Sequence, residues 1–115
     1  VLNHAGLPAD RSERGLAGWH AAMTRLADCP NLRVKISGIG LPDRPWTVAD
    51  NRWIVEEIIA MFGTERAMFA SNFPVDRLYS SFEALFDAYD TVTKDFTASE
   101  REQLFAATAE RFYRI

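Results

Sequence analysis

Residues 30–40, PNLRVKISGIG, decide the fold. The run from Leu32 to Ile39 is rich in Val and Ile and ends among glycines, which predicts a β-strand. Arg66–Ser71, RAMFAS, predicts a second strand, and Val1-Leu2, followed by Gly and Pro turn residues, reads as the end of another. Three short strands are thus expected, well separated along the chain.

The segments between and after these strands have helical patterns. Apolar side chains at helical spacing predict helices, and a proline, a glycine or a capping residue marks their ends. The predicted helices run over about Leu16–Asp28, from a Thr47 cap to Phe62, over about Phe82–Thr93, and from a capping box at Thr97-Ala98-Ser99-Glu100 onward. Strand and helix alternate three times, which is typical of a parallel α/β sheet.

Three parallel strands on their own leave two long edges open, so the predicted architecture is incomplete. A complete (β/α)8 barrel takes about 250 residues, and three of its eight units take roughly 95. The chain has 115 residues. We therefore expect one partial domain over residues 1–115. We also expect the chain to associate with another copy or with a missing N-terminal part, because the open edges need cover.

Charge and composition exclude several classes of partner. With 13 Lys+Arg against 16 Asp+Glu, the net charge of -3 argues against a nucleic-acid surface, although a local basic pocket stays open. The longest apolar stretch, Trp53–Phe62, contains two glutamates and is far shorter than the roughly 20 residues that span a bilayer. The single cysteine, Cys29, cannot form an internal disulfide, and we expect a small buried side chain there. We expect a cytoplasmic protein with a small-molecule substrate.

Polar side chains follow the end of each predicted strand. His4 comes after the first, Lys35 and Ser37 lie at the end of the second, and Asn72 and Asp76 follow the third. In parallel α/β folds the carboxyl ends of the strands carry the functional groups, because the loops converge there. The sequence therefore predicts that these side chains form one site.

Each of these residues also has a purely structural interpretation. His4 would hydrogen-bond its own loop, and Asp76 would cap its turn. Lys35 and Ser37 lie on the same side of their strand by the period of two, and a satisfied polar pair at the wet end of the strand is slightly favoured over a substrate role. The residues alone leave both interpretations open.

Two arginines and a second histidine complete the candidates. Arg44 and Arg77 follow the second and third predicted strands, where a guanidinium suits a bidentate grip on a substrate carboxylate. Solvent-exposed arginines are the commoner case at such positions. His20 lies on the apolar stripe of the first predicted helix, so we expect it to be structural.

Four runs of this chain resemble one family. They are LNHAGLP (2–8), PNLRVKISG (30–38), FGTERAMFASNFPVD (62–76) and AERFYRI (109–115). Together they resemble the C-terminal part of the amidohydrolase-related (amidohydrolase 2) TIM-barrel, metal-dependent hydrolases, which include sugar lactonases and 2-pyrone-4,6-dicarboxylate lactonase. The resemblance implies strands six to eight of a (β/α)8 barrel, and a complete protein that hydrolyses a small cyclic ester (a lactone) or an amide. It also implies that a His-x-His pair and a further His, absent here, complete the site.

The resemblance implies roles for three residues. His4 matches the family's histidine at the end of the sixth strand, a metal ligand or proton-transferring group. Asn72 stands where the family usually has an Asp that binds metal and acts as general base, and an amide brings neither charge nor basicity at neutral pH. Asp76 is the candidate for a displaced carboxylate. A divalent metal, Zn²⁺ or Mn²⁺, is implied with His4 as a ligand, and the change at Asn72 weakens that expectation.

Two alternatives to the hydrolase stay open. Some members of the family are decarboxylases, so cleavage of a C–C bond in a small carboxylic acid is one of them. The other is a truncated, non-catalytic barrel segment, because His4 and a neutral Asn72 supply fewer ligands than the three protein groups that catalytic zinc usually takes. The isolated chain is expected to be inactive. The sequence names neither the substrate, nor the metal, nor the oligomeric state.

Overall fold

The computed structural model describes all 115 residues. In it, the predicted strand segments 32–39 and 66–71 contain two neighbouring parallel strands. Strand β1 (Val34–Ile36) pairs with β2 (Ala67–Phe69), with Lys35 opposite Met68. Leu2 adds a single parallel bridge to Val34 on the other side of β1. The predicted α/β class with parallel strands is confirmed. The strands are shorter than predicted, because the chain after β1 soon turns at Gly38, whose φ is +59°.

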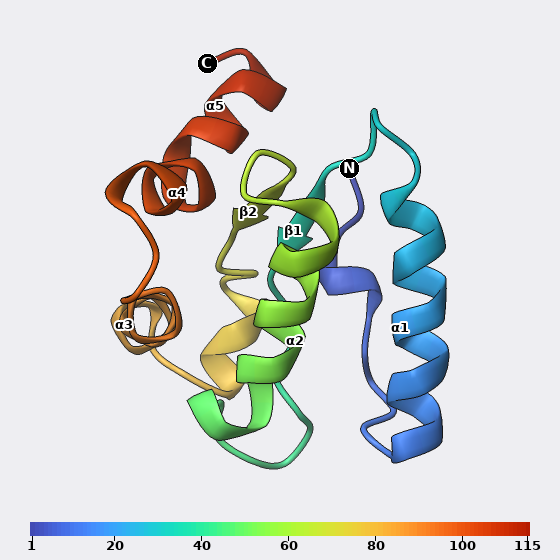
Figure 1. Cartoon of the computed structure of the whole chain (residues 1–115). Coiled ribbons are helices and arrows are strands. Elements are labelled where there is room, and N and C mark those ends of the chain that lie inside the picture. The colour runs from blue at the N-terminus through green and yellow to red at the C-terminus, as the bar shows by residue number, and fades with distance from the viewer.

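Helices occupy most of the remaining chain (Figure 1). The three long helices are α1 (Glu13–Ala27), α2 (Val48–Phe62) and α3 (Phe82–Val92). The C-terminal segment consists of α4 (Ala98–Glu102), a π-helical turn η3 (Gln103–Ala107) and α5 (Thr108–Tyr113). Two short 3-10 turns, η1 (His4–Gly6) and η2 (Val75–Leu78), follow the first and last strand segments. None of the helices has the length and apolar character needed to cross a membrane.

Side-chain caps explain where the helices begin. At four helix starts the side-chain oxygen of a Ser or Thr accepts a hydrogen bond from the backbone N–H of the residue three positions later. These caps are Ser12, Thr47, Ser81 and Thr97. Such caps satisfy amides that have no partner within the helix. Helix α1 starts earlier than predicted because Ser12 caps it, whereas the cap of α2, the Gly63 that ends it and the capping box at Thr97 agree with the prediction.

The core lies where the sheet meets α1, α2 and α3. Its largest fully buried side chains include Met23, Ile36, Ile54, Ile58, Leu85 and Tyr89. Cys29 is exposed, so the prediction that it is buried is wrong. Helix α1 ends at Ala27, and Cys29 lies in the turn that leads from α1 to β1 on the surface.

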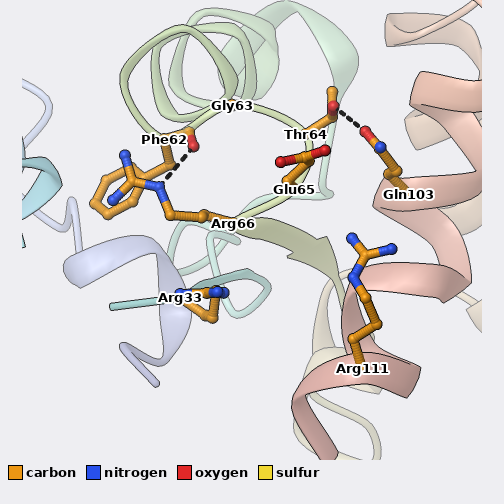
Figure 2. Close-up of a pocket in the computed structure, with 8 residues that line it drawn as sticks. All are labelled: Arg33, Phe62, Gly63, Thr64, Glu65, Arg66, Gln103 and Arg111. Atoms are coloured by element: carbon orange, nitrogen blue, oxygen red, sulfur yellow. Dashed lines mark hydrogen bonds between the residues drawn. The ribbon is translucent and has the colours of Figure 1, made fainter. Parts of the chain in front are cut away.

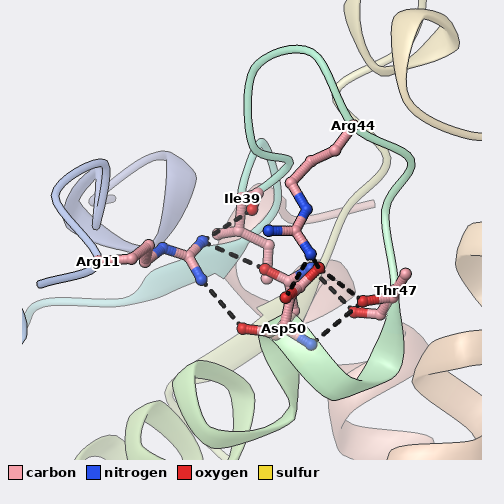
Figure 3. A network of polar contacts seen from close by, with 6 residues as sticks. Arg11, Ile39, Arg44, Thr47 and Asp50 are labelled. Atoms are coloured by element: carbon pink, nitrogen blue, oxygen red, sulfur yellow. Dashed lines mark hydrogen bonds and ion pairs between the residues drawn. The ribbon is translucent and has the colours of Figure 1, made fainter.

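Arg11 links three segments of the fold (Figure 3). Its guanidinium donates to the carbonyl oxygen of Ile39 at 2.9 Å and to that of Asp50 at 3.1 Å. It also donates to the side chain of Asn51 and to the carbonyl oxygen of Pro8. Burial lowers the pKa of Arg11, an effect that the Asp50 carboxylate opposes, and the group stays charged. The loops after the first strand segment and after β1 are thereby held to the start of α2.

We expect Arg11→Met to lower the free energy of unfolding by about 2 kcal/mol, because several carbonyl oxygens lose a charged donor. Urea denaturation measures this change. Arg14→Met is the matched control, because Arg14 is exposed and forms no side-chain hydrogen bond or ion pair. Equal stabilities of the two variants would show that the Arg11 contacts contribute little.

Candidate functional site

Polar side chains from three strand ends meet at one edge of the sheet. His4 Nδ1 lies 3.1 Å from Ser37 Oγ, and Asn72 Nδ2 donates to Asp76 Oδ1 at 2.9 Å. Gly38 lies between these two pairs, since a Cβ placed on it would come within 2.5 Å of His4 Nδ1 and 3.1 Å of Asn72 Nδ2. These five residues are called the strand-end cluster below.

The backbone of the strand-end cluster is left-handed at three of its positions. The φ angles are +53° at His4, +59° at Gly38 and +55° at Asn72. Such angles are uncommon for residues other than glycine, and Asn and His are among the side chains that accept them best. Non-glycine residues keep this conformation only where the surrounding structure holds them in it, and they are often found at functional sites. The conformation sets the direction in which His4 and Asn72 leave the main chain.

Asp76 is the buried charge of the cluster. It lies on η2 and is 1% exposed, and its Oδ2 is buried with no hydrogen-bond partner. Burial raises the pKa of Asp76, and the Asn72 amide, the His4 ring and the Gly38 backbone N–H each lower it in part, leaving it above its ordinary value. The carboxylate contacts Asn72 instead of capping its own turn. It therefore places a buried carboxyl group in the same cluster as the imidazole.

Glycine at position 38 is required by space as well as by backbone angle. We expect Gly38→Ala to lower the free energy of unfolding by about 1–3 kcal/mol, because the new methyl group meets the His4 ring and φ is positive. Thermal unfolding with calorimetry measures the loss. Gly18→Ala is the control: a Cβ there has no neighbour within 4 Å, and this substitution within α1 is expected to stabilise by about 0.5–1 kcal/mol. A Gly38→Ala protein as stable as the parent would contradict this geometry.

Lys35 and Arg77 are not brought to the cluster. Lys35 Nζ lies over the ring of Tyr113, 5.7 Å from its centre, so the expected polar pair between Lys35 and Ser37 does not form. Ser37 has His4, on the neighbouring segment, as its partner instead. Arg77 is exposed and forms no side-chain hydrogen bond, while Arg44 pairs with a carboxylate on α2 at 3.1 Å. Substrate binding by Lys35, Ser37 and Arg77 stays a prediction.

His20 lies apart from the cluster, on α1. Its Nε2 is 2.8 Å from Glu57 Oε2, and its ring stacks on Trp53 with centres 6.2 Å apart. These contacts join α1 to α2. They fit the structural role expected for His20.

Tyr89 is a residue near the cluster that the sequence did not single out. From α3 its hydroxyl donates to the carbonyl oxygens of Ile36, at 3.2 Å, and Ala70, at 3.3 Å. These carbonyls stand at the ends of β1 and β2, directly before the polar loops. Burial and the charge of Asp76 raise the pKa of Tyr89. The available signal was a tyrosine on a buried helix face, whose hydroxyl needs a partner.

The side chains of this chain do not complete a metal site by themselves. The structure contains no group of three or more His, Cys, Asp or Glu side chains placed to hold a metal ion. The cluster offers one imidazole, one carboxylate and the Asn72 amide, whereas catalytic zinc usually takes three protein ligands. His4 and Asp76 are the donors that this chain contributes.

Comparison with known proteins gives the family. A family model described as amidohydrolase matches residues 1–115. The chain belongs to the amidohydrolase family. It is 48% identical over 115 residues to the uncharacterized protein y4mH of Sinorhizobium fredii and 33% identical over 127 residues to an L-fucono-1,5-lactonase of Burkholderia multivorans. Both alignments cover all of this chain but only 38% and 43% of the two relatives, respectively. The chain therefore spans about two-fifths of their length.

Solved amidohydrolases have the same arrangement of elements. A crystal structure of an amidohydrolase from Burkholderia multivorans with bound HEPES aligns with a TM-score of 0.86 and 31% identity, over 99% of this chain and 44% of that one. A crystal structure of an amidohydrolase from the same organism with bound zinc aligns with a TM-score of 0.86 and 30% identity, over 99% of this chain and 43% of that one. A lactonase-like amidohydrolase is therefore what this chain resembles, in sequence and in structure.

Proposed function

We propose that this chain forms strands six to eight of a (β/α)8 barrel whose complete protein hydrolyses a small lactone. The observation that carries the proposal is the strand-end cluster, which brings a half-buried histidine and a buried carboxyl group together at the carboxyl ends of parallel strands. An L-fucono-1,5-lactonase among the relatives supports a cyclic ester as the substrate class. The finer assignment of roles below follows from the exposure of each group.

His4 is the group of the cluster that moves the proton. Ser37 holds its Nδ1, which leaves Nε2 free for water or substrate. As water attacks the lactone carbonyl, a C–O bond forms and the water proton passes to His4. The ring C–O bond then breaks, and the proton passes from His4 to the departing ring oxygen. The product is the open hydroxy acid, and the protein returns to its starting state.

Asp76 and Asn72 support His4 in this scheme. Asp76 is buried, so it acts as the negative charge that stabilises the protonated ring, and Asn72 holds one carboxylate oxygen in place. A carboxylate at position 76 thereby takes over part of the role that the family's Asp has at position 72. A divalent metal, Zn²⁺ or Mn²⁺, would polarise the carbonyl when bound, and a zinc ion in the crystal structure of a relative supports this. His4 is the ligand that this chain would offer in the alternative in which Nε2 binds the metal instead of moving the proton.

The experiment that tests the proposal is an assay of the complete protein against panels of lactones and of aromatic carboxylic acids. We expect turnover of at least one small lactone, with a dependence on added Zn²⁺ or Mn²⁺. Release of CO₂ from an aromatic acid without lactone turnover would replace the lactonase by a decarboxylase of the same family. Inactivity of the complete protein towards both panels would favour a non-catalytic segment.

The surroundings of the chain are part of the proposal. Strand β2 pairs with β1 on one side and has no strand partner on the other. Leu2, which bridges to Val34 of β1, likewise has no strand partner on its other side. We propose that further strands of the barrel, or a second copy, cover these edges. The partners are otherwise a small-molecule substrate in the cytoplasm, without nucleic acid or membrane. A well-behaved monomer of the isolated chain in sedimentation experiments would count against the proposed edge pairing.

A further inference from the structure

A hollow lies at the opposite end of the strands from the strand-end cluster, and Figure 2 shows the residues that line it. Its volume is about 730 Å³, and its lining includes Arg33, Arg66 and Arg111 with Glu65. Arg33 directly precedes β1, and Arg66 directly precedes β2, so the hollow opens at the amino ends of both strands. An adjoining hollow of about 380 Å³ shares Arg33, Glu65 and Arg111 and adds Arg114. We call the two together the arginine hollow.

The arginine hollow concentrates positive charge on a chain of net charge -3. Four arginines line it against one glutamate, a difference of three charges. None of these five side chains takes part in an ion pair: the pairs of this structure are His20–Glu57, Arg44–Asp50, Arg52–Glu56 and Arg101–Asp90. These four arginines are therefore not ion-paired within the chain.

One of the four guanidinium groups, that of Arg66, has a structural role, and the other three have free hydrogen-bond donors. Arg66 donates to the carbonyl oxygens of Phe62, Ala27 and Cys29, and so ties together the ends of α1 and α2. Arg66 therefore forms a fixed part of the lining of the hollow.

The other three arginines keep most of their hydrogen-bond capacity. Arg33 donates one bond, to Pro30 O, and Arg111 donates one, to Thr108 Oγ1, while Arg114 donates none. Each guanidinium has five N–H donors, so several remain free. Figure 2 shows the Arg111 guanidinium pointing from its helix toward the loop that carries Glu65.

We propose that the arginine hollow binds the dianionic phosphate group of a small molecule, or free phosphate. Guanidinium forks match the oxygens of phosphate in bidentate pairs, and clusters of arginine favour a ligand with more than one negative charge. A monocarboxylate has one charge and two oxygens and leaves more of the cluster uncompensated. The site is separate from the proposed lactone chemistry, because it lies at the other end of the strands.

Calorimetric titration of the protein at constant ionic strength tests the proposal, with inorganic phosphate, glycerol 3-phosphate and acetate as probes. We expect saturable binding of one phosphate per chain and weaker binding of acetate. Tighter binding of glycerol 3-phosphate than of phosphate would assign the hollow to a phosphate ester, and the reverse order would assign it to the free anion. Absence of saturable phosphate binding would overturn the proposal.

The variant for this test is Arg111→Gln with Arg114→Gln, since both side chains are exposed and neither ties helices together. We expect at least about tenfold weaker phosphate binding, the size of effect that loss of charged hydrogen bonds produces. Arg52→Gln is the matched control, because Arg52 lies on α2 and pairs with Glu56 outside the hollow. An equal loss in the control variant would show general attraction by charge and would overturn a specific site. Circular dichroism verifies that both proteins are folded.

Discussion

Replacement of His4 by Gln is expected to lower kcat/KM for lactone hydrolysis by about 100- to 10,000-fold in the complete protein, the range typical of a lost general acid–base group. Gln keeps the polar character and much of the volume of the side chain, but it cannot accept and release a proton at neutral pH. The loss should appear mainly in kcat, because the proton transfer belongs to the chemical step. Steady-state kinetics with a lactone substrate measure both constants.

His20→Gln is the matched control for this prediction. His20, unlike His4, is paired with a carboxylate, that of Glu57, and it lies on α1, away from the strand ends. We expect its kcat/KM to stay within about twofold of the parent, with a stability loss below about 1 kcal/mol because the pair is partly exposed. If both histidine variants lost activity equally, the assignment of proton transfer to His4 would be wrong.

Asp76→Asn is expected to reduce activity about 100-fold and, at the same time, to stabilise the protein at neutral pH. The loss of activity follows from removal of the charge that stabilises protonated His4. The gain in stability follows from burial: Asp76 is 1% exposed and one of its oxygens has no partner, so the ionised form is disfavoured in the folded state. A neutral amide is less costly to bury than a carboxylate.

The pH dependence of the stability gain has a definite sign. Burial raises the pKa of Asp76 in the folded protein above its value in the unfolded chain, about 4. As pH rises between these two pKa values, the unfolded chain releases the proton first, so the folded state loses stability across that window. The melting temperatures of parent and Asp76→Asn should therefore coincide below about pH 4 and diverge above it, with the variant melting at the higher temperature at pH 7.

Two further variants make the Asp76 prediction decisive. Asp95→Asn removes an exposed carboxylate and is expected to change neither activity nor the pH dependence of stability. The double variant Asn72→Asp with Asp76→Asn exchanges the two side chains and can keep their hydrogen bond with its direction reversed. We expect it to recover at least about tenfold of the lost activity, since a carboxylate is again present beside His4. Failure of Asp76→Asn to raise the melting temperature at pH 7 would contradict the buried, ionised Asp76.

Local patterns predicted the secondary structure well where a single side chain decides it. Thr47, Thr97 and Gly63 mark helix ends through contacts with residues three or four positions away, and such contacts can be inferred from spacing. The strands were overestimated because apolar character continues into the loops beyond Ile36 and Phe69. Residues there can stay buried although they no longer pair as strands. Ile39 is an example, since it is buried but lies beyond the end of β1.

Contacts between distant segments could not be predicted in the same way. Arg11 meets acceptors that lie 28 to 40 residues further along the chain, and its surroundings carry no signature in sequence. The same holds for Ser37, which reaches His4 across 33 residues instead of pairing with Lys35 two positions before it. For Asp76 the sequence left open a turn cap and a displaced carboxylate, and the hydrogen bond that the carboxyl group accepts from Asn72 could not be inferred from spacing. These outcomes depend on tertiary packing and on the left-handed backbone that aims the side chains.

The left-handed main chain at Asn72 also limits how this site can change by mutation. With φ at +55°, the position accepts Gly, Asn and Asp with little strain, whereas β-branched or bulky residues would be strained there. Asn and Asp codons differ by one nucleotide, so the substitutions that the backbone tolerates include one, Asn72→Asp, that a single nucleotide change produces and that adds an ionisable carboxyl group. With Asp76 hydrogen-bonded to the side chain at position 72, two carboxylates would share a proton instead of both ionising. A single nucleotide change can thus place a second, proton-sharing carboxyl group at the strand ends, at a position whose backbone already suits it.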